Sequence, residues 1–191
     1  AAEAFNNYQK PDLLVPCPGV TLLVALQAGN TFACSPCLYL FSRKLLASMN
    51  SWFDEGCLRE DEGFTAELYC RATRAISLSK RLFRRRVRPG SIMTSPWSWK
   101  HVKGSIQAAI RIEPLLNVPN AMEPAARKAL RRHQRMLVRC ALRTAENIGQ
   151  NETFKRMLKE RLKTVRLLTI DPAMLVYLHA NLLFCGLRRL R

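Results

Sequence analysis

The sequence predicts a mainly α protein, a helical bundle of about six helices preceded by an irregular apolar N-terminal segment with at most one short strand. Three observations predict this class. Capping residues stand directly before proline at several points, and apolar residues recur at three-and-four spacing in the basic segments. Only one short run is rich in β-branched residues. The chain has 191 residues, so folding would bury roughly 70% of its unfolded surface, and a real core is expected.

The helix starts are marked by a side chain that can accept a backbone N–H bond, followed by proline at the first helical position. Such pairs begin at residues 35, 95 and 171, and Asn120 with Glu123 has the spacing of a capping box. Pro89 and Pro114 are expected to end two helices. The predicted helices span residues 36–54, 65–87, 96–112, 121–147, 152–168 and 172–190.

Residues 20–26 form the one predicted strand, a short apolar run with β-branched side chains that follows Pro18-Gly19. No charged residue occurs from 13 to 42, but prolines and glycines interrupt this stretch too often for a membrane-spanning helix. The apolar run at 173–187 is too short to cross a bilayer comfortably and is expected to be a buried helix. We therefore expect no transmembrane segment.

The charge balance is the unusual feature of the composition. Thirty-one Lys and Arg against fourteen Asp and Glu give a formal net charge of +17, which predicts a polyanionic partner. The excess is uneven, because residues 1–64 hold four basic and seven acidic residues. We interpret 1–64 as an apolar, near-neutral segment that docks on neighbouring proteins, and 65–191 as a basic helical domain.

The predicted helix 65–87 places apolar residues on one face and most of its cations elsewhere. Few acids are nearby to pair with these cations, and Arg binds phosphate through two parallel hydrogen bonds. RNA phosphates are therefore the expected ligands, and a solvated charged face is the alternative. The candidate residues here are Arg71, Arg74, Lys80, Arg81, Arg84, Arg85, Arg86 and, just beyond the helix, Arg88.

The predicted helix 121–147 repeats this plan, with Leu130 and Leu137 directed inward. Its cations are expected to contact RNA phosphates with strong salt dependence, again with a solvated face as the alternative. The candidate residues are Arg127, Lys128, Arg131, Arg132, Arg135 and Arg139, followed by Arg143.

Two tryptophans stand between these helices among cations, in the order Trp97, Trp99, Lys100 and Lys103. An indole can stack on an unpaired base while a lysine holds the backbone, which predicts contact with single-stranded RNA. The alternative is that the indoles pack in a core or against another protein. Because residues two apart point to different sides of a helix, at most one is expected to stack.

The seven cysteines are too few for a disulfide scaffold, and their odd number favours a reducing compartment. No metal or cofactor is predicted. The set that comes nearest to a zinc site lacks a second paired C-x-x-C, and inert thiols are the alternative. That set is Cys17, Cys34, Cys37 and Cys57. The Cys34-Ser35-Pro36-Cys37 turn also resembles the redox turn of thioredoxins, but the strands of that fold are not predicted.

The sequence predicts that the protein is not an enzyme and has no small-molecule substrate. The three histidines, His101, His133 and His179, each stand alone among basic or apolar neighbours. No phosphate-binding glycine loop, dinucleotide fingerprint, zinc-protease motif or nucleophile elbow occurs in the chain.

The last 60 or so residues resemble the LYR-motif family of small mitochondrial three-helix proteins. His133-Gln134 stands in place of the Leu-Tyr of the naming motif. The resemblance implies that the helices receive the acyl chain of a mitochondrial acyl carrier protein and that Arg135 and Arg139 contact its acidic surface. It is carried by Arg135, Arg139, Arg143, Lys155, Arg156, Lys159, Asp171-Pro172, Leu175 and Leu178.

Basic charge, free cysteines and a first residue other than Met predict a mitochondrial ribosomal protein of the matrix. The expected partners are rRNA, through the Arg-rich helices, and other ribosomal proteins, through the apolar N-terminal third. The alternative is an LYR-like accessory subunit or assembly factor of a respiratory complex that binds acyl carrier protein.

Overall fold

The computed structural model describes residues 8–49, 52–84, 86, 88–92, 94–117 and 122–162. The fold is mainly α, as predicted, with six α-helices and one two-stranded antiparallel sheet in this part of the chain. The elements are β1 (Leu13–Cys17), α1 (Gly19–Ala28), the 3-10 helix η2 (Pro36–Leu38), α2 (Arg43–Ser48), α3 (Glu60–Arg71), β2 (Ala75–Ser77), α4 (Trp99–Leu116), α5 (Pro124–Asn147) and α6 (Asn151–Leu162).

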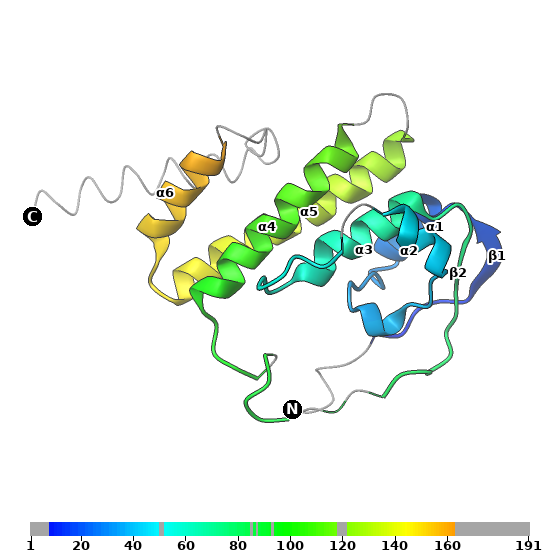
Figure 1. Cartoon of the computed structure of the whole chain (residues 1–191), viewed down its shortest axis with the longest axis horizontal. Helices are drawn as coiled ribbons and strands as arrows, with labels where there is room; N and C mark the ends of the chain where they lie inside the picture. The colour runs from blue at the N-terminus through cyan, green and yellow to red at the C-terminus, as the bar shows by residue number, and fades with distance from the viewer. Residues whose placement is uncertain are drawn as a thin grey trace, which may run out of the picture.

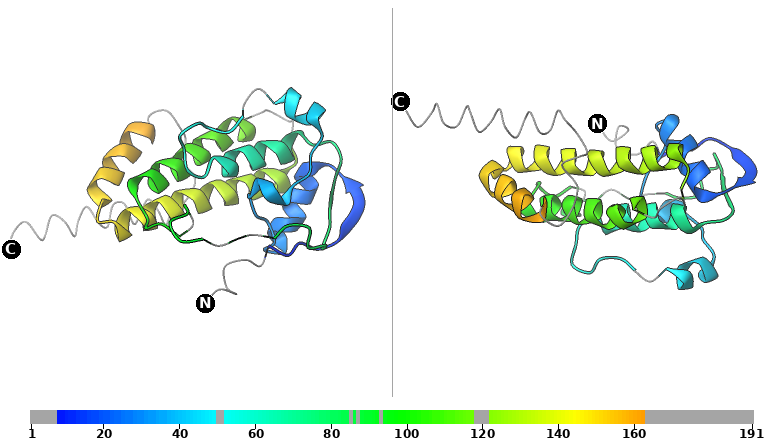
Figure 2. Two further views of the ribbon diagram at one scale, coloured as in Figure 1. Left: turned by 60° about the horizontal axis from the view of Figure 1, so that its bottom comes forward. Right: turned by 90° about the horizontal axis from the view of Figure 1, so that it is seen from above.

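The two longest helices, α4 and α5, lie side by side along most of their length and run in opposite directions (Figures 1 and 2). Apolar residues at three-and-four spacing form the contact, among them Ile106 and Ile112 of α4 and Leu130 and Leu137 of α5, all at most 2% exposed. Helices α1 and α3 pack against one end of this pair, and α6 packs against the other end of α5 (Figure 2).

Gln134 is a buried polar side chain in the middle of this core, with no exposed surface. Its Nε2 atom donates to the carbonyl oxygen of Ala109 at 2.9 Å and to Oε2 of Glu113 at 2.8 Å. Both partners belong to α4, so the amide joins the two long helices at a defined register. These two hydrogen bonds satisfy the amide nitrogen and favour one alignment of the helices, whereas the buried Oε1 atom has no hydrogen-bond partner among the described residues.

The two strands form a short ribbon, in which Leu13 lies opposite Ser77 and Cys17 lies opposite Ala75. The backbone N–H of Gly19 donates to the carbonyl oxygen of Ala72 at 2.8 Å, which joins the start of α1 to the end of α3. Helix α3 spans positions 60 to 71 and α1 packs against both α3 and α5. The predicted N-terminal segment 1–64 and the predicted domain 65–191 therefore both contribute residues to the main core.

No helix among the described residues is long and apolar enough to cross a membrane. The sequence predicted no transmembrane segment, and the apolar run at 173–187 lies outside the described residues.

The strand predicted at 20–26 is wrong, because these residues lie inside α1. Leu22, Leu23 and Leu26 fall on one side of the helix and are at most 3% exposed, buried in the main core. Tertiary burial of this leucine face outweighs the modest preference of the neighbouring β-branched residues for extended structure.

The helix predicted at 36–54 is also wrong in extent. Pro36 begins only the 3-10 turn η2, and the chain is extended again at Tyr39. Helix α2 begins later, where the Ser42 Oγ atom accepts a hydrogen bond from the backbone N–H of Leu45 at 3.1 Å. A second capping serine thus supplied the true helix start.

The helix predicted at 65–87 is displaced, because α3 begins at Glu60 and ends at Arg71. Its first turn holds Glu60, Asp61 and Glu62, where the helix dipole favours negative charge. After β2 the chain is not helical, and Leu82 and Phe83, expected on a buried face, are 79% and 45% exposed. A helix here would have no apolar surface on which to pack.

The remaining helices agree with the prediction in position but differ at their ends. Helix α4 starts after Ser98, not after Ser95, and continues through Pro114 to Leu116. Helix α5 starts with Pro124 at its first position. Asn120, the end of the predicted helix 152–168 and the whole of 172–190 lie outside the described residues.

Gly104 allows the closest backbone approach in the core, because a Cβ atom there would lie 1.9 Å from the carbonyl oxygen of Leu58. We expect Gly104→Ala to lower the free energy of unfolding by about 1–3 kcal/mol, since α4 must move away from the backbone at Leu58. Gly29→Ala is the control, because its Cβ would meet Ala25 at an ordinary 3.6 Å. Urea denaturation of the full chain measures both, and equal stability of the two variants would contradict this packing.

Candidate nucleic-acid interface

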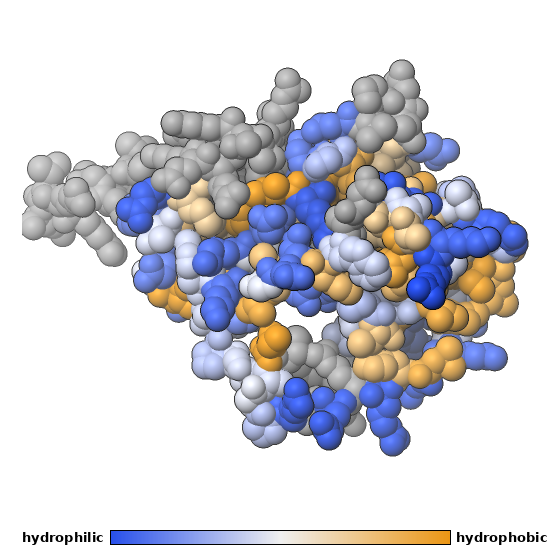
Figure 3. Space-filling view, in the orientation of Figure 1, coloured by the Kyte–Doolittle hydropathy of each residue, from blue (hydrophilic) through white to orange (hydrophobic). Residues whose placement is uncertain are grey.

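The first candidate surface is the basic arm, which we define as residues 78–98, between β2 and α4. This segment contains no acidic residue. It leaves the ribbon and loops around the outside of the bundle before α4 begins (Figure 1). Hydrophilic residues gather along its path at the lower edge of the molecule (Figure 3). Five of the predicted RNA-binding cations are exposed here, and Arg85 lies outside the described residues; the five are Lys80, Arg81, Arg84, Arg86 and Arg88.

The arm is attached at its root by Asp12. The backbone N–H of Ser79 donates to Asp12 Oδ1 and the Ser79 hydroxyl donates to Oδ2, each at 2.7 Å. These hydrogen bonds, with a smaller contribution from the charge of Lys80, lower the pKa of the Asp12 carboxyl from its usual value. The carboxylate therefore fixes the point at which the chain leaves the folded body.

The far end of the arm is a compact turn held by hydroxyl groups. The Thr94 Oγ1 atom donates to the carbonyl oxygen of Arg88 at 3.0 Å, and the Ser95 Oγ atom donates to that of Ser91 at 2.9 Å. At the start of α4 the backbone N–H of Ser98 donates to His101 Nδ1 at 3.1 Å, within a capping box. Burial and the nearby Arg59 lower the pKa of the His101 imidazole, which favours the neutral, accepting form.

The two tryptophans have different environments, but not because of helical spacing, since α4 begins at Trp99 and Trp97 precedes it. Trp97 is 52% exposed, with its ring edge-on to His101 at a centroid distance of 5.0 Å and the Arg59 guanidinium 5.9 Å from its centroid. Trp99 is half-buried and packs against the main core. Only Trp97 presents a ring to an incoming base. The two lysines that follow, Lys100 and Lys103, are exposed.

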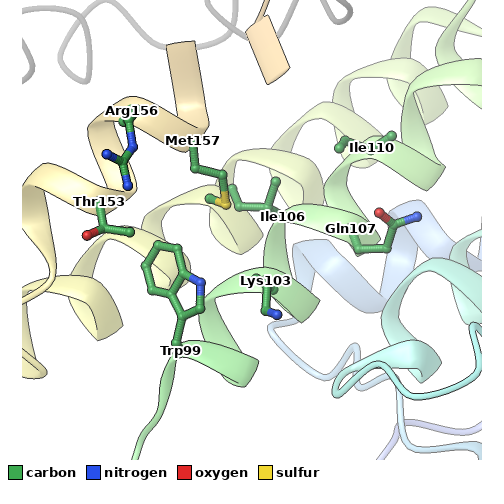
Figure 4. A pocket seen from close by; sticks show the side chains of 8 residues that line it. All are labelled: Trp99, Lys103, Ile106, Gln107, Ile110, Thr153, Arg156 and Met157. Carbon is green, nitrogen blue, oxygen red and sulfur yellow. The ribbon is translucent and has the colours of Figure 1, made fainter. Parts of the chain in front are cut away.

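Trp99 also lines an open pocket of about 290 Å³ between α4 and α6. Its side chain and that of Met157 converge across the pocket, with Lys103 and Arg156 near the opening (Figure 4). Packing against α6 explains why this indole is withdrawn from the surface.

The second candidate surface is the α5 stripe, which we define as Lys128, Arg132, Arg135, Arg139 and Arg143. These residues follow one another at intervals of three or four and are all exposed. The opposite face of α5 is buried against α4 and α1. Over fifteen residues the stripe extends about 22 Å, since an α-helix rises 1.5 Å per residue.

Contacts within the fold hold several of the predicted basic residues. Arg132 of the stripe donates to the carbonyl oxygen of Gln27 at 3.4 Å and to Asn30 Oδ1 at 3.3 Å. Arg127 is half-buried and donates to the carbonyl oxygen of Leu116, and Arg131 is half-buried. Arg71 pairs with Glu67 at 2.8 Å, whereas Arg74 is exposed between α3 and β2. Arg71 and Arg127 thus have structural roles that the sequence did not reveal.

The structure does not bring the four predicted cysteines together as a zinc site. Cys17 lies in β1, where its thiol contacts the carbonyl oxygen of Ala75 at 3.8 Å, and Cys37 is exposed. Cys34 is buried, and this burial, with the charge of Glu62, raises the pKa of its thiol well above the usual value. The four sulfur atoms form no common ligand group, although Cys34 and Cys37 are only three positions apart. A raised pKa is also the opposite of what a redox-active turn needs.

Glu62 and His133 lie beside Cys34, and this cluster was not predicted from the sequence. The available signal was His133 itself, which stands on the apolar face of α5 and is only 4% exposed.

Of the residues that carry the LYR-family resemblance, Arg135, Arg139, Arg143 and Arg156 are exposed on α5 and α6. Asp171-Pro172, Leu175 and Leu178 lie outside the described residues, as do the side chains of Lys155 and Lys159.

Comparison with known proteins found no match among family models, curated proteins or solved structures.

Asp12→Ala tests the attachment of the arm. We expect the Ser79 amide to lose most of its protection from hydrogen exchange, because both hydrogen bonds to the carboxylate disappear. In the native chain the same protection should be present above the usual Asp pKa and fall as the pH drops through the lowered folded-state pKa, since protonation removes the acceptor charge. Amides of α1 serve as the internal control, and unchanged protection at Ser79 would contradict this role.

The tryptophans allow a matched pair of truncations. Trp99→Ala should lower the free energy of unfolding by about 2 kcal/mol, because it removes a half-buried ring from the contact between α4 and α6. Trp97→Ala should change it by less than about 1 kcal/mol, since the ring is mostly at the surface. Thermal and urea denaturation compare the two variants, and the reverse order would refute the assigned environments.

Proposed function

We propose that the protein is a structural, non-catalytic component of a mitochondrial ribosome. In this proposal the basic arm and the α5 stripe bind rRNA, and exposed apolar residues of the N-terminal third dock on neighbouring ribosomal proteins. Its place of action is the mitochondrial matrix, where cysteines remain reduced, which agrees with the free thiols of the described part of the chain.

The basic arm is the observation that carries this proposal. Six cations stand within nine residues, from Lys80 to Arg88, and no acid is present from 78 to 98. The described cations of this run are exposed and belong to no helix or strand. A segment of this kind gains little from packing on its own fold, whereas RNA phosphates would neutralise it and release counterions. An extended arm can also follow a groove that a rigid helix cannot enter.

The α5 stripe supports the same function in a different way. It is held rigid by the buried face of α5, so its guanidinium groups lie at fixed intervals along one line. Arginine suits phosphate because its planar fork donates two parallel hydrogen bonds. The rigid stripe and the non-helical arm would together bind two segments of a folded RNA. Trp97 would stack on an unpaired base beside the arm.

Exposed apolar side chains support docking on proteins. On the ribbon, Leu14 and Val15 are 61% and 82% exposed, and Ile76 is 48% exposed. Further along, Leu40 and Trp52 are also largely exposed. Apolar residues gathered on one end of a molecule are typical of a surface that another chain covers.

Sedimentation of the tagged native complex through a sucrose gradient tests the proposed assembly. We expect the chain to migrate with a ribosomal subunit and to be released when ribonuclease digests the RNA. Migration in a ribonuclease-resistant complex that contains an acyl carrier protein would refute the ribosomal proposal and favour the LYR-like alternative.

Charge removal tests the proposed RNA surface directly. Arg84→Gln with Arg86→Gln should weaken binding to a structured RNA hairpin and reduce the slope of log K against log salt by about 1.4–1.8, corresponding to two lost phosphate contacts. Arg43→Gln with Lys44→Gln is the matched control, because it removes the same charge from exposed positions of α2. Equal effects of the two double variants would mean that net charge, and not the arm, determines binding.

A further inference from the structure

Three side chains of metal-ligand type meet inside the fold, where the segment after α1, the first turn of α3 and the middle of α5 come together. They are Cys34, Glu62 and His133, and one ligand atom of each lies within 4.8 Å of the other two. The Cys34 Sγ atom is 3.6 Å from His133 Nε2, and Nε2 is 3.2 Å from Glu62 Oε2. Among the described residues no other group of this kind was found.

These separations fit the ligand shell of a tetrahedral zinc ion. Bonds of about 2.3 Å to sulfur and about 2.0–2.1 Å to nitrogen or oxygen place a sulfur and a nitrogen roughly 3.6 Å apart, and a nitrogen and an oxygen roughly 3.4 Å apart. The two measured distances lie within about 0.2 Å of these values. Two of the three separations therefore match a zinc ligand shell, and the third, between the Cys34 Sγ atom and the Glu62 carboxylate, is at most 4.8 Å.

Hydrogen bonding already links the three groups, because Glu62 accepts from His133 and from the Cys34 thiol. The same nitrogen, His133 Nε2, faces both the thiol and the carboxylate. A ring nitrogen carries at most one proton, so it can donate to only one of these two groups at a time. Convergence of a sulfur, a nitrogen and an oxygen on one point is the arrangement that a shared cation requires.

Neighbouring groups hold each ligand in place. The carbonyl oxygen of Cys34 accepts a hydrogen bond from Thr65 Oγ1 at 2.9 Å, and the ring of Phe32 packs edge-on against His133. Arg59 Nη1 lies 3.4 Å from Oε1 of Glu62, which leaves Oε2 directed at His133. Such supporting contacts orient metal ligands and are a regular part of metal sites.

We propose that Cys34, Glu62 and His133 bind one Zn²⁺ ion, with the fourth position open to a water molecule or another small ligand. Mixed sulfur, nitrogen and oxygen ligands in tetrahedral geometry suit zinc better than magnesium or calcium, which take oxygen ligands. A thiolate and a carboxylate would balance the two charges of the ion.

The bound ion would join parts of the chain that are distant in sequence, since Cys34 and His133 are 99 positions apart. It would hold the irregular segment after α1 against α3 and α5, in addition to the ring contacts of Phe32 and Tyr39 there. This site is independent of the proposed RNA surface, because none of its ligands belongs to the basic arm or the α5 stripe.

Metal analysis of the full chain, purified after expression in zinc-supplemented medium, tests the proposal. We expect one zinc per chain, lost in Cys34→Ala and in His133→Phe, and at least tenfold weaker binding in Glu62→Gln. Cys37→Ala is the matched control, because this nearby cysteine is exposed and outside the cluster. It should keep the full zinc content.

A cobalt titration of the native sequence, after removal of metal with a chelator, keeps the test decisive if a ligand variant fails to fold. A thiolate-to-cobalt charge-transfer band with tetrahedral character at one equivalent is expected, together with a higher melting temperature on adding zinc. A native chain with neither zinc nor this band would overturn the proposal. Loss of the band in Cys37→Ala but not in Glu62→Gln would overturn this ligand set.

Discussion

The packing of α4 against α5 is the contact on which the rest of the structure depends. It buries the apolar faces of both helices and aligns them through the hydrogen bonds of Gln134 to Ala109 and Glu113. Once this pair is formed, α1 and α3 have a surface on which to bury their own apolar residues. The requirement for close approach explains Gly104, whose missing side chain admits the backbone at Leu58.

The same packing decides where the positive charge can go. Because one side of α5 is committed to the core, its arginines are confined to the α5 stripe and its margins. The arm has no such surface to cover, so the chain from 78 to 98 stays outside the bundle. Most of the positive charge therefore lies on the surface and little of it lies in the core. The largely buried Arg111 is paired with Glu67 and Asp54. An assembly built on RNA would make use of that separation.

Much of the fold could be predicted from local signals, but the errors have a common cause. The mainly α class and the positions of α4 and α5 follow from capping residues and three-and-four spacing, both of which act within a few residues. Residues 20–26 were misjudged because burial of Leu22, Leu23 and Leu26 in a distant core outweighs local preference. Residues 75–77 of the predicted helix 65–87 instead form β2 and pair with β1, and Leu82 and Phe83 beyond them are exposed. The cationic residues themselves were predictable, but not the division between an arm and a stripe.

The sequence by itself determined the helical class, the large cationic excess and its confinement to the chain after residue 64. Composition and short-range spacing carry that information, because charge is additive and capping is local. Only the tertiary structure decided which basic residues are tied to neighbouring groups, which indole is exposed, and that Cys34, Glu62 and His133 meet. Those outcomes depend on contacts between residues far apart in the chain. Such contacts form only when several helices bury their apolar faces together, so no local pattern encodes them.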